Sequence, residues 1–242
     1  MPELTNRQVN VLKHIIEEYI ETAKPVGSEV LDKKFNLGVS PATLRNEMVE
    51  LTRLGYLSQP HTSAGRAPTP AALKLYVSTL MQPKNLSVTD EVKIKEKVMD
   101  LRSEFQKALR EATRELAQST KSLAVATDDD GDAYYAGTAN ILDMPEFYDI
   151  NLTRSVLSLL DHFDYLDKIF SRAAGSDINL LLGDELGYDY LEPCAMVFTR
   201  FGQGKSHQGV IGVMGPYRLN YPRLIPTIRY FGSLLDEVAG SF

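Results

Sequence analysis

Residues 40–69 read SPATLRNEMVELTRLGYLSQPHTSAGRAPT. This stretch predicts a helix that begins after Ser40, because the serine hydroxyl can accept a hydrogen bond from an early amide and Pro41 suits the first helical position. Gly55 suits a residue with positive φ that ends the helix. Apolar residues recur along the helix at spacings of four and three: Leu44, Met48 and Leu51. We expect this stripe to face a core.

The segment after the helix predicts a short hairpin. Tyr56 and Leu57 begin an extended run that ends at Pro60, and a small polar tip follows at residues 61–66 before the chain returns. A helix followed by a short hairpin is typical of the recognition unit of a winged helix. Such a unit places helix side chains in the major groove of DNA and the hairpin tip against the backbone or the minor groove.

Composition places the chain among globular proteins. At 242 residues, with 43% apolar residues, it is long enough for two domains that each bury a core. Cys194 is the single cysteine, which excludes an intramolecular disulfide and suits a reducing compartment. The sequence shows no signal peptide and no apolar run of about 18 residues, the length needed to span a membrane. We therefore expect a cytoplasmic protein.

The net charge of −6 is unevenly distributed. Residues 1–82 hold nine of the 26 Lys/Arg and eight of the 32 Asp/Glu, so the acidic excess lies in the remainder of the chain. A nearly neutral segment beside an acidic one is weak evidence for nucleic-acid binding, and clustering of basic side chains on one face would matter more.

The periodicity predicts three segments. Residues 1–82 form a winged helix-turn-helix domain, with a first helix at residues 5–22 that Thr5 caps. Ser28 is expected to cap a short second helix, and its inward residues are Val30, Leu31 and Phe35. A fourth helix starts at Thr69-Pro70.

Residues 83–123 are expected to form a linker and one long helix, from about residue 89 to 123. The helix carries a heptad seam: Ile94, Val98, Leu101 and Phe105. A helix of this length cannot bury its stripe alone, so it needs its own domain or a second copy of the chain. We expect the seam to contribute to dimerisation.

Residues 124–242 predict an α+β domain. Short apolar strands at 124–126, 134–142, 178–182, 194–198 and 210–214 alternate with Gly- and Asp-rich turns. Helices are expected at about 151–172 and 221–238. The fold class of the whole chain is therefore α+β.

Several long stretches resemble the heat-inducible transcription repressor HrcA family. They are EEYIETAKPVGSEVL and GVSPATLRNEMVELTRLGYLSQPHTSAGRAPT near the N-terminus, GTANILDMPEF at residues 137–147 and GVIGVMGPYRLNYPRLIPTIRY at residues 209–230. The resemblance implies a winged-helix reader, a long helix and a GAF-like domain. It also implies a homodimer that represses chaperone genes from an inverted-repeat operator of CIRCE type, with the chaperonin GroEL as a partner. The chain resembles a shortened form, which lacks most of an insert usual in the second domain.

The candidate DNA-binding residues come from three places. In the recognition helix they are Ser40, Thr43, Arg45 and Asn46. At the hairpin tip they are His61, Thr62, Ser63 and Arg66, and before the helix they are Lys33 and Lys34. Arg can pair with guanine and Asn with adenine in the major groove. The alternative for Arg45 is an internal salt bridge with the carboxylates around Glu47, and for the tip it is a merely polar loop.

The sequence shows no catalytic, cofactor or metal site. Asp128, Asp130 and Asp132 have the spacing of a calcium loop, but Ala133 and Ala139 stand where the loop needs Gly and Glu. We expect a solvated turn there, and we expect Cys194 to be buried and unreactive. The rival interpretations are a regulator that senses a small ligand in the GAF-like domain and an enzyme built on that same domain. The sequence shows no recognisable pair of nucleophile and base that would support the interpretation as an enzyme.

Overall fold

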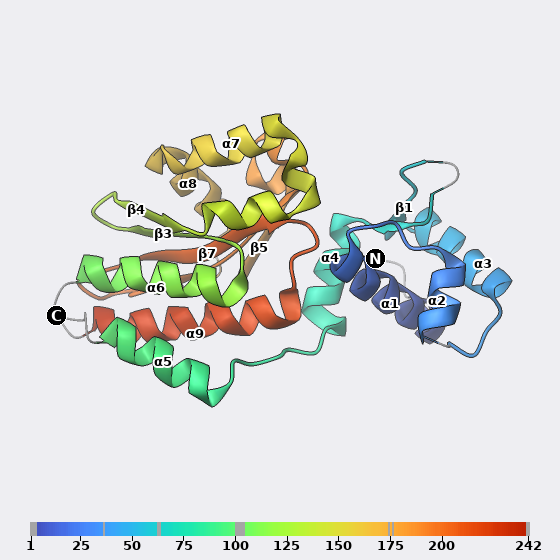
Figure 1. The fold of residues 1–242 in the computed structure, drawn as a ribbon, viewed down its shortest axis with the longest axis horizontal. Helices are drawn as coiled ribbons and strands as arrows, with labels where there is room; N and C mark the ends of the chain where they lie inside the picture. The colour runs from blue at the N-terminus through green and yellow to red at the C-terminus, as the bar shows by residue number, and fades with distance from the viewer. Residues whose placement is uncertain are drawn as a thin grey trace. The chain divides into compact units, whose positions relative to one another are not determined.

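The computed structural model describes residues 4–35, 37–61, 64–99, 105–173, 175 and 177–240. The chain divides into two compact units, Met1–Gln82 and Pro83–Phe242. Helices and strands occur in both units, so the α+β class expected from the sequence is confirmed (Figure 1).

The first unit consists of helices and one small hairpin. Its elements are α1 (Asn6–Thr22), α2 (Ser28–Phe35), α3 (Pro41–Arg53), β1 (Leu57–Ser58), β2 (Ala67–Pro68) and α4 (Pro70–Leu75), which continues as a π-helical turn, Tyr76–Leu80. The strands β1 and β2 pair antiparallel. This order of a helix-turn-helix followed by a hairpin matches the expected winged helix.

Local capping fixes the helix ends as the sequence predicts. The Thr5 hydroxyl accepts a hydrogen bond from the Gln8 amide at 3.2 Å, and the Gln8 side chain accepts one from the Thr5 amide at 3.0 Å. These two bonds form a capping box that satisfies two amides at the start of α1. Gly55 closes α3 with φ of 82°, a conformation that costs glycine little.

The apolar stripes of α1, α2 and α3 meet in one core. Leu12, Ile15, Leu31, Leu44 and Leu51 are all 0% exposed. The expectation fails for Val30, which is 43% exposed on α2. On so short a helix the sequence pattern did not separate the inward residue Leu31 from its neighbour.

The base of the hairpin is tied to the loop between α1 and α2. The amide of Val26 donates to the carbonyl of Arg66 and the amide of Arg66 donates to the carbonyl of Val26, both at 2.8 Å. Gly65 permits this approach, since a Cβ there would lie 2.4 Å from the carbonyl carbon of Val26. Backbone hydrogen bonds therefore hold the hairpin on two sides.

The second unit is built on a five-stranded sheet. Its strands are β3 (Leu123–Asp128), β4 (Ala133–Ala136), β5 (Asn179–Leu182), β6 (Cys194–Phe201) and β7 (Gly209–Pro216). They lie in the order β4-β3-β7-β6-β5, and every neighbouring pair is antiparallel. β3 lies beside β7, although the 80 residues from 129 to 208 separate them.

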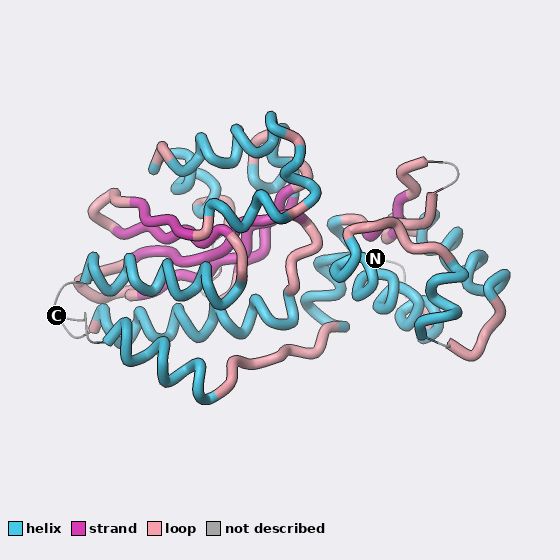
Figure 2. The backbone as a smooth tube through the Cα atoms, in the orientation of Figure 1, coloured by secondary structure: helices cyan, strands magenta, loops and turns pink. Residues whose placement is uncertain are grey.

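Helices cover both faces of this sheet (Figures 1 and 2). α7 (Ile150–Leu160) and α8 (Phe163–Phe170) lie on one face, while α6 (Phe105–Thr120) and α9 (Tyr221–Ala239) lie on the other. α5 (Val88–Met99) packs against the outer side of the latter pair, where Lys95 pairs with Glu237 at 2.9 Å. Burial on both faces explains why β3 is an unbroken run of buried residues.

The prediction of a single long helix from residue 89 to 123 is wrong. The structure has two helices, α5 and α6, and they lie side by side. The Lys97 ammonium and the Glu115 carboxylate are 2.5 Å apart. In one continuous helix these residues would be about 27 Å apart along the axis. Both helices therefore belong to the compact second unit.

Two further elements differ from expectation. The strand expected at residues 134–142 ends at Ala136 and is followed by two 3₁₀ helices, Thr138–Asp143 and Pro145–Tyr148. The helix expected at residues 151–172 is two helices, α7 and α8. Apolar spacing marks the residues that must be buried, but it does not show where a chain turns between two buried runs.

Candidate nucleic-acid interface

One face of α3 is open to solvent. Leu44, Met48 and Leu51 are buried as predicted. The exposed side carries residues at helical spacing: Ala42, Arg45, Asn46, Val49 and Arg53. Two hydrogen-bonding side chains on adjacent positions of an open helix face suit contact with base edges in a major groove.

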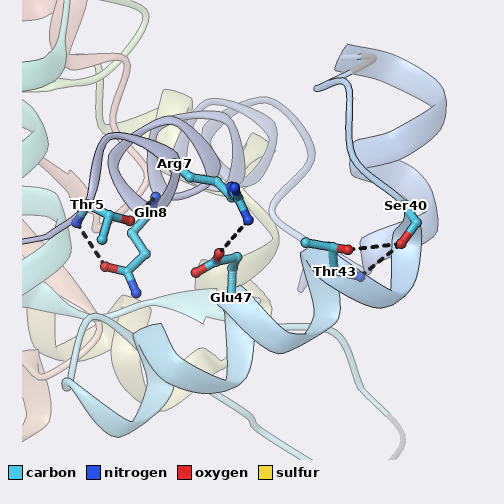
Figure 3. Close-up of polar contacts among 6 residues, drawn as sticks. All are labelled: Thr5, Arg7, Gln8, Ser40, Thr43 and Glu47. Atoms are coloured by element: carbon cyan, nitrogen blue, oxygen red, sulfur yellow. Dashed lines mark hydrogen bonds and ion pairs between the residues drawn. The ribbon is translucent and has the colours of Figure 1, made fainter.

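Ser40 and Thr43 lie at the start of this face and are bonded to each other. The Ser40 hydroxyl accepts a hydrogen bond from the Thr43 amide at 3.2 Å and lies 3.0 Å from the Thr43 hydroxyl (Figure 3). Both side chains therefore serve the helix cap. Ser40 is exposed and Thr43 is half-buried.

The two glutamates of α3 are held by arginines. Arg7 reaches from α1 to Glu47, with 3.4 Å between guanidinium nitrogen and carboxylate oxygen (Figure 3). Arg53 donates to Glu50 at 2.5 Å, and this hydrogen bond lowers the pKa of the Glu50 carboxyl. Each negative charge on the helix is thereby offset by an adjacent positive one, which reduces the repulsion that an anionic ligand would meet.

Arg45 and Asn46 are exposed, and no other described residue pairs with the Arg45 guanidinium. The internal salt bridge considered for Arg45 is absent from the part of the chain that the structure describes, where Glu47 pairs with Arg7 and Glu50 pairs with Arg53. Arg45 lines a groove of about 520 Å³ between α2, α3 and the base of the hairpin, together with Gln59 and Arg66.

Arg66 lies at the base of the hairpin rather than at its tip. Its Nε donates to the Thr52 hydroxyl at 3.0 Å, and its backbone pairs with Val26. His61 is exposed in the turn, where its carbonyl accepts a hydrogen bond from the Ala64 amide at 2.9 Å. Thr62 and Ser63 lie outside the described residues.

The two neighbouring lysines of α2 have different surroundings. Lys34 contacts two carboxylates of α1, Glu18 at 2.6 Å and Glu21 at 2.5 Å. These hydrogen bonds raise the pKa of the Lys34 ammonium. Lys33 is exposed, and no such pair with it occurs among the described residues. Lys34 therefore joins α2 to α1, whereas Lys33 is available to an external anion.

Three of the four residues expected to form a dimer seam are covered within one chain. Ile94, Val98 and Phe105 are 3%, 0% and 5% exposed, and Leu101 lies outside the described residues. α5 contacts α6 and α9 through polar side chains, and the ring centroids of Phe105 on α6 and Phe201 on β6 lie 6.0 Å apart. A second copy of the chain is not needed to cover these three residues.

Sequence reasoning missed two features of the interface. Val49 is 51% exposed on the open face, between Asn46 and Arg53. Its spacing from the buried stripe could have revealed it, because it follows Arg45 by four residues and Asn46 by three. The Arg7–Glu47 pair joins residues 40 positions apart, so no local signal could have found it.

The described ranges also contain the acidic turn at residues 128–132 and the single cysteine. No group of three or more His, Cys, Asp or Glu side chains there could hold a metal ion. Cys194 is buried as expected, and burial raises the pKa of its thiol to about 12. Within the same ranges, none of the helices combines the length and the apolarity needed to cross a bilayer.

The chain is similar to known proteins along almost its whole length. A family model described as the HrcA protein C-terminal domain matches residues 72–225. The heat-inducible transcription repressor HrcA of Desulforudis audaxviator is 27% identical over 97% of this chain and 98% of that protein. The protein of the same name from Carboxydothermus hydrogenoformans is 26% identical over 98% of this chain and 99% of that protein.

The first of these alignments is 336 residues long, whereas this chain has 242 residues. The relative therefore carries residues that have no counterpart here, in keeping with a shortened form.

A crystal structure of a hypothetical protein at 2.2 Å resolution has a similar fold, with a TM-score of 0.78 and 21% identity over 99% of both chains. The family match spans more than half of the sequence and the relatives share one name. The chain therefore belongs to the HrcA family, and these two relatives are named heat-inducible transcription repressors.

Proposed function

We propose that this protein is a homodimeric, sequence-specific DNA-binding repressor of heat-shock (chaperone) genes that binds an inverted-repeat operator of CIRCE type. The observation that carries the proposal is the open face of α3. Arg45 and Asn46 are exposed there, while Glu47 and Glu50 are each held by an arginine. Family membership supports the repressor role.

The open face supplies the chemistry for reading bases. The guanidinium of Arg45 can donate two hydrogen bonds to guanine, and the amide of Asn46 can pair with adenine. Each such contact discriminates against a wrong base by about 1–3 kcal/mol. Ser40 and Thr43, at the N-terminal turn, would lie closest to the sugar-phosphate backbone, where their hydroxyls can donate to phosphate oxygens.

The surroundings of the helix supply contacts to the backbone. Lys33 and Lys34 on α2 and the hairpin residues His61, Thr62, Ser63 and Arg66 would position the reader on the duplex. Such contacts fix register but carry no sequence information. Because Lys34 is already engaged by Glu18 and Glu21, we expect Lys33 to contribute more.

An inverted repeat requires two readers related by a two-fold axis. The half-sites would then lie an integral number of helical turns apart, about 10 base pairs or a multiple. Since Ile94, Val98 and Phe105 are buried within one chain, the dimer that we propose would pair through another surface.

Binding-site selection followed by fluorescence anisotropy tests the proposal. We expect an inverted repeat to be selected and to bind far more tightly than a scrambled duplex. For a dimer that contacts about six phosphates or more, affinity should fall about 10³-fold or more between 50 mM and 200 mM salt. Equal affinity for the repeat and the scrambled duplex would rule out sequence-specific repression.

Single substitutions separate base reading from phosphate contact. Asn46→Ala should reduce the preference for the selected repeat, whereas Lys33→Ala should weaken all sequences about equally and lower the salt dependence. Lys13→Ala is the control for lost charge, because Lys13 lies on α1 near Glu17. If Asn46→Ala and Lys33→Ala had the same effect on every sequence, the division of roles would be wrong.

The chaperonin GroEL is proposed as a partner on the strength of the family resemblance alone. Repression measured with and without purified chaperonin tests it directly. We expect chaperonin to increase the fraction of protein that is competent to bind the repeat. If chaperonin left the binding-competent fraction unchanged, this shortened form would not be under chaperonin control.

A ligand-sensing regulator is a second candidate function, favoured by one pocket of the second unit. This pocket of about 370 Å³ is lined by residues of α8 and of the strands β3, β6 and β7, and its lining carries both charges: Arg200, Asp129 and Asp167. A small polar effector would suit such a lining. A metabolite screen by thermal shift tests this candidate, and the Arg200→Ala variant should lose any shift that the pocket produces.

A further inference from the structure

Two valines are exposed on the otherwise mostly polar surface around α3. Val49 is 51% exposed and Val30 is 43% exposed, and within the described part of the first unit they are the large apolar side chains most open to solvent. Neither contributes to the core. Valine also has a lower helix propensity than alanine, so neither position is explained by helix stability.

Both valines line the same groove. They come from different helices, α2 and α3, and the groove between them has a volume of about 520 Å³. Its remaining lining includes the cations Arg45 and Arg66, the carboxylate of Glu29, the amide of Gln59 and the thioether of Met48. An apolar contact is thus placed among charged and hydrogen-bonding groups, of which two are arginines and one is a glutamate.

The position of Val49 relates it to the residues proposed to read bases. It follows Arg45 by four positions and Asn46 by three, so the three side chains share one helix face. A side chain there would reach the base pair next to those that Arg45 and Asn46 contact.

The major groove presents one apolar group on a base edge, the 5-methyl group of thymine. Arginines beside a valine are complementary to such a surface, because phosphates and base acceptors surround the methyl group. We propose that Val49 contacts a thymine methyl group in each half-site, with Val30 closing the groove behind it. This inference rests on the proposed function and adds a specificity-determining residue to it.

A double-mutant cycle between protein and DNA tests the contact. The DNA is the selected inverted repeat, in which each thymine in turn is replaced by deoxyuridine, which lacks the methyl group. The protein is the full chain, either native or with Val49→Ala. Native protein should lose about four-fold in affinity per half-site at one thymine position, the effect of one buried methyl group. Val49→Ala should bind the thymine and deoxyuridine forms of that position equally.

Val92→Ala is the matched control, since Val92 is 50% exposed but lies on α5 in the second unit. It should leave the deoxyuridine effect of native protein unchanged. Val49→Thr keeps the shape of the side chain but replaces one methyl group with a hydroxyl, so it should reduce the coupling without changing the fold.

The outcomes separate this inference from the proposed function. Failure to select an inverted repeat would contradict the proposed function itself. Selection of a repeat, together with identical deoxyuridine effects in native protein and Val49→Ala at every position, would overturn the thymine contact alone. Coupling to Val30→Ala but not to Val49→Ala would overturn the assignment to Val49.

Discussion

The helices α3 and α6 both carry an apolar stripe, but they differ in what covers their other sides. On α3 the three buried residues lie on one side, and Arg45, Asn46 and Val49 face solvent. On α6 half of the residues are buried, including Glu115, which Lys97 neutralises. A helix covered on one side keeps a surface for a ligand, whereas a helix covered on several sides serves the core. The stripe alone does not distinguish the two cases.

The largest expected effect concerns the covered helices. Ile94→Ala should reduce the free energy of unfolding by about 2–5 kcal/mol, because it leaves a cavity between α5 and its neighbours. Val92→Ala on the exposed side of the same helix should change it by less than about 0.5 kcal/mol. Chemical denaturation measures both values.

Sedimentation velocity completes that comparison. Neither variant should change the oligomeric state, since Ile94 is buried within one chain. If Ile94→Ala separated a dimer into folded monomers, the stripe on α5 would belong to an interface between copies. The contrast between α3 and the covered helices α5 and α6 would then disappear.

The next effect concerns the hairpin beside the open face. Gly65→Ala places a Cβ 2.4 Å from the carbonyl carbon and oxygen of Val26, so backbone must move. We expect a loss of about 1–3 kcal/mol in the free energy of unfolding of the first unit. The amides of Val26 and Arg66 should also exchange faster with solvent hydrogen.

Gly27→Ala is the control for that substitution, because a Cβ at Gly27 meets no atom within 4 Å. Both variants add the same methyl group near the same loop. Equal stability of the two variants would show that the hairpin base is not held as the structure places it.

The smallest effect distinguishes the neighbouring lysines of α2. Lys34→Ala should lower the thermal midpoint of the first unit, because Glu18, only 7% exposed, loses its nearest positive charge. Lys33→Ala should leave the midpoint unchanged and weaken DNA binding instead. Thermal unfolding and fluorescence anisotropy measured on both variants test whether Lys34 serves stability and Lys33 serves DNA binding.

The pH dependence follows from the raised pKa of Lys34. A cation whose pKa is higher in the folded state stabilises that state below its unfolded pKa, near 10.5, and the stabilisation is lost as pH rises through the folded value. The difference between native protein and Lys34→Ala should therefore persist at neutral pH and shrink only in strongly alkaline solution. A difference that shrank between neutral and mildly alkaline pH would contradict the assigned pair.

The sequence predicted local features of the fold better than distant ones. The cap at Ser40, the glycine stop at Gly55 and the buried stripe of α3 depend on residues within a few positions of each other. The separation of α5 from α6 depends on contacts such as Lys97–Glu115, which no local pattern encodes. The same reason explains why the long helix was expected in error.

The candidate interface shows the same division. Arg45 and Asn46 could be chosen from their places on a helical face, and both are exposed. Tertiary packing decides three other features. It brings Lys34 to Glu18, it places Arg66 at the hairpin base, and it leaves Val30 exposed. Residue type and spacing identify candidates, whereas their neighbours decide which of them a ligand can reach.

The paired hydrogen bonds between Val26 and Arg66 have a consequence for evolution. They use only main-chain atoms, and they hold the hairpin below its tip. Related proteins could therefore lengthen, shorten or rewrite the residues between Gln59 and Ala64 while retaining the frame that carries them. Such a frame would let the backbone contacts made by the tip, and with them the strength of binding, change among descendants without a cost in foldability.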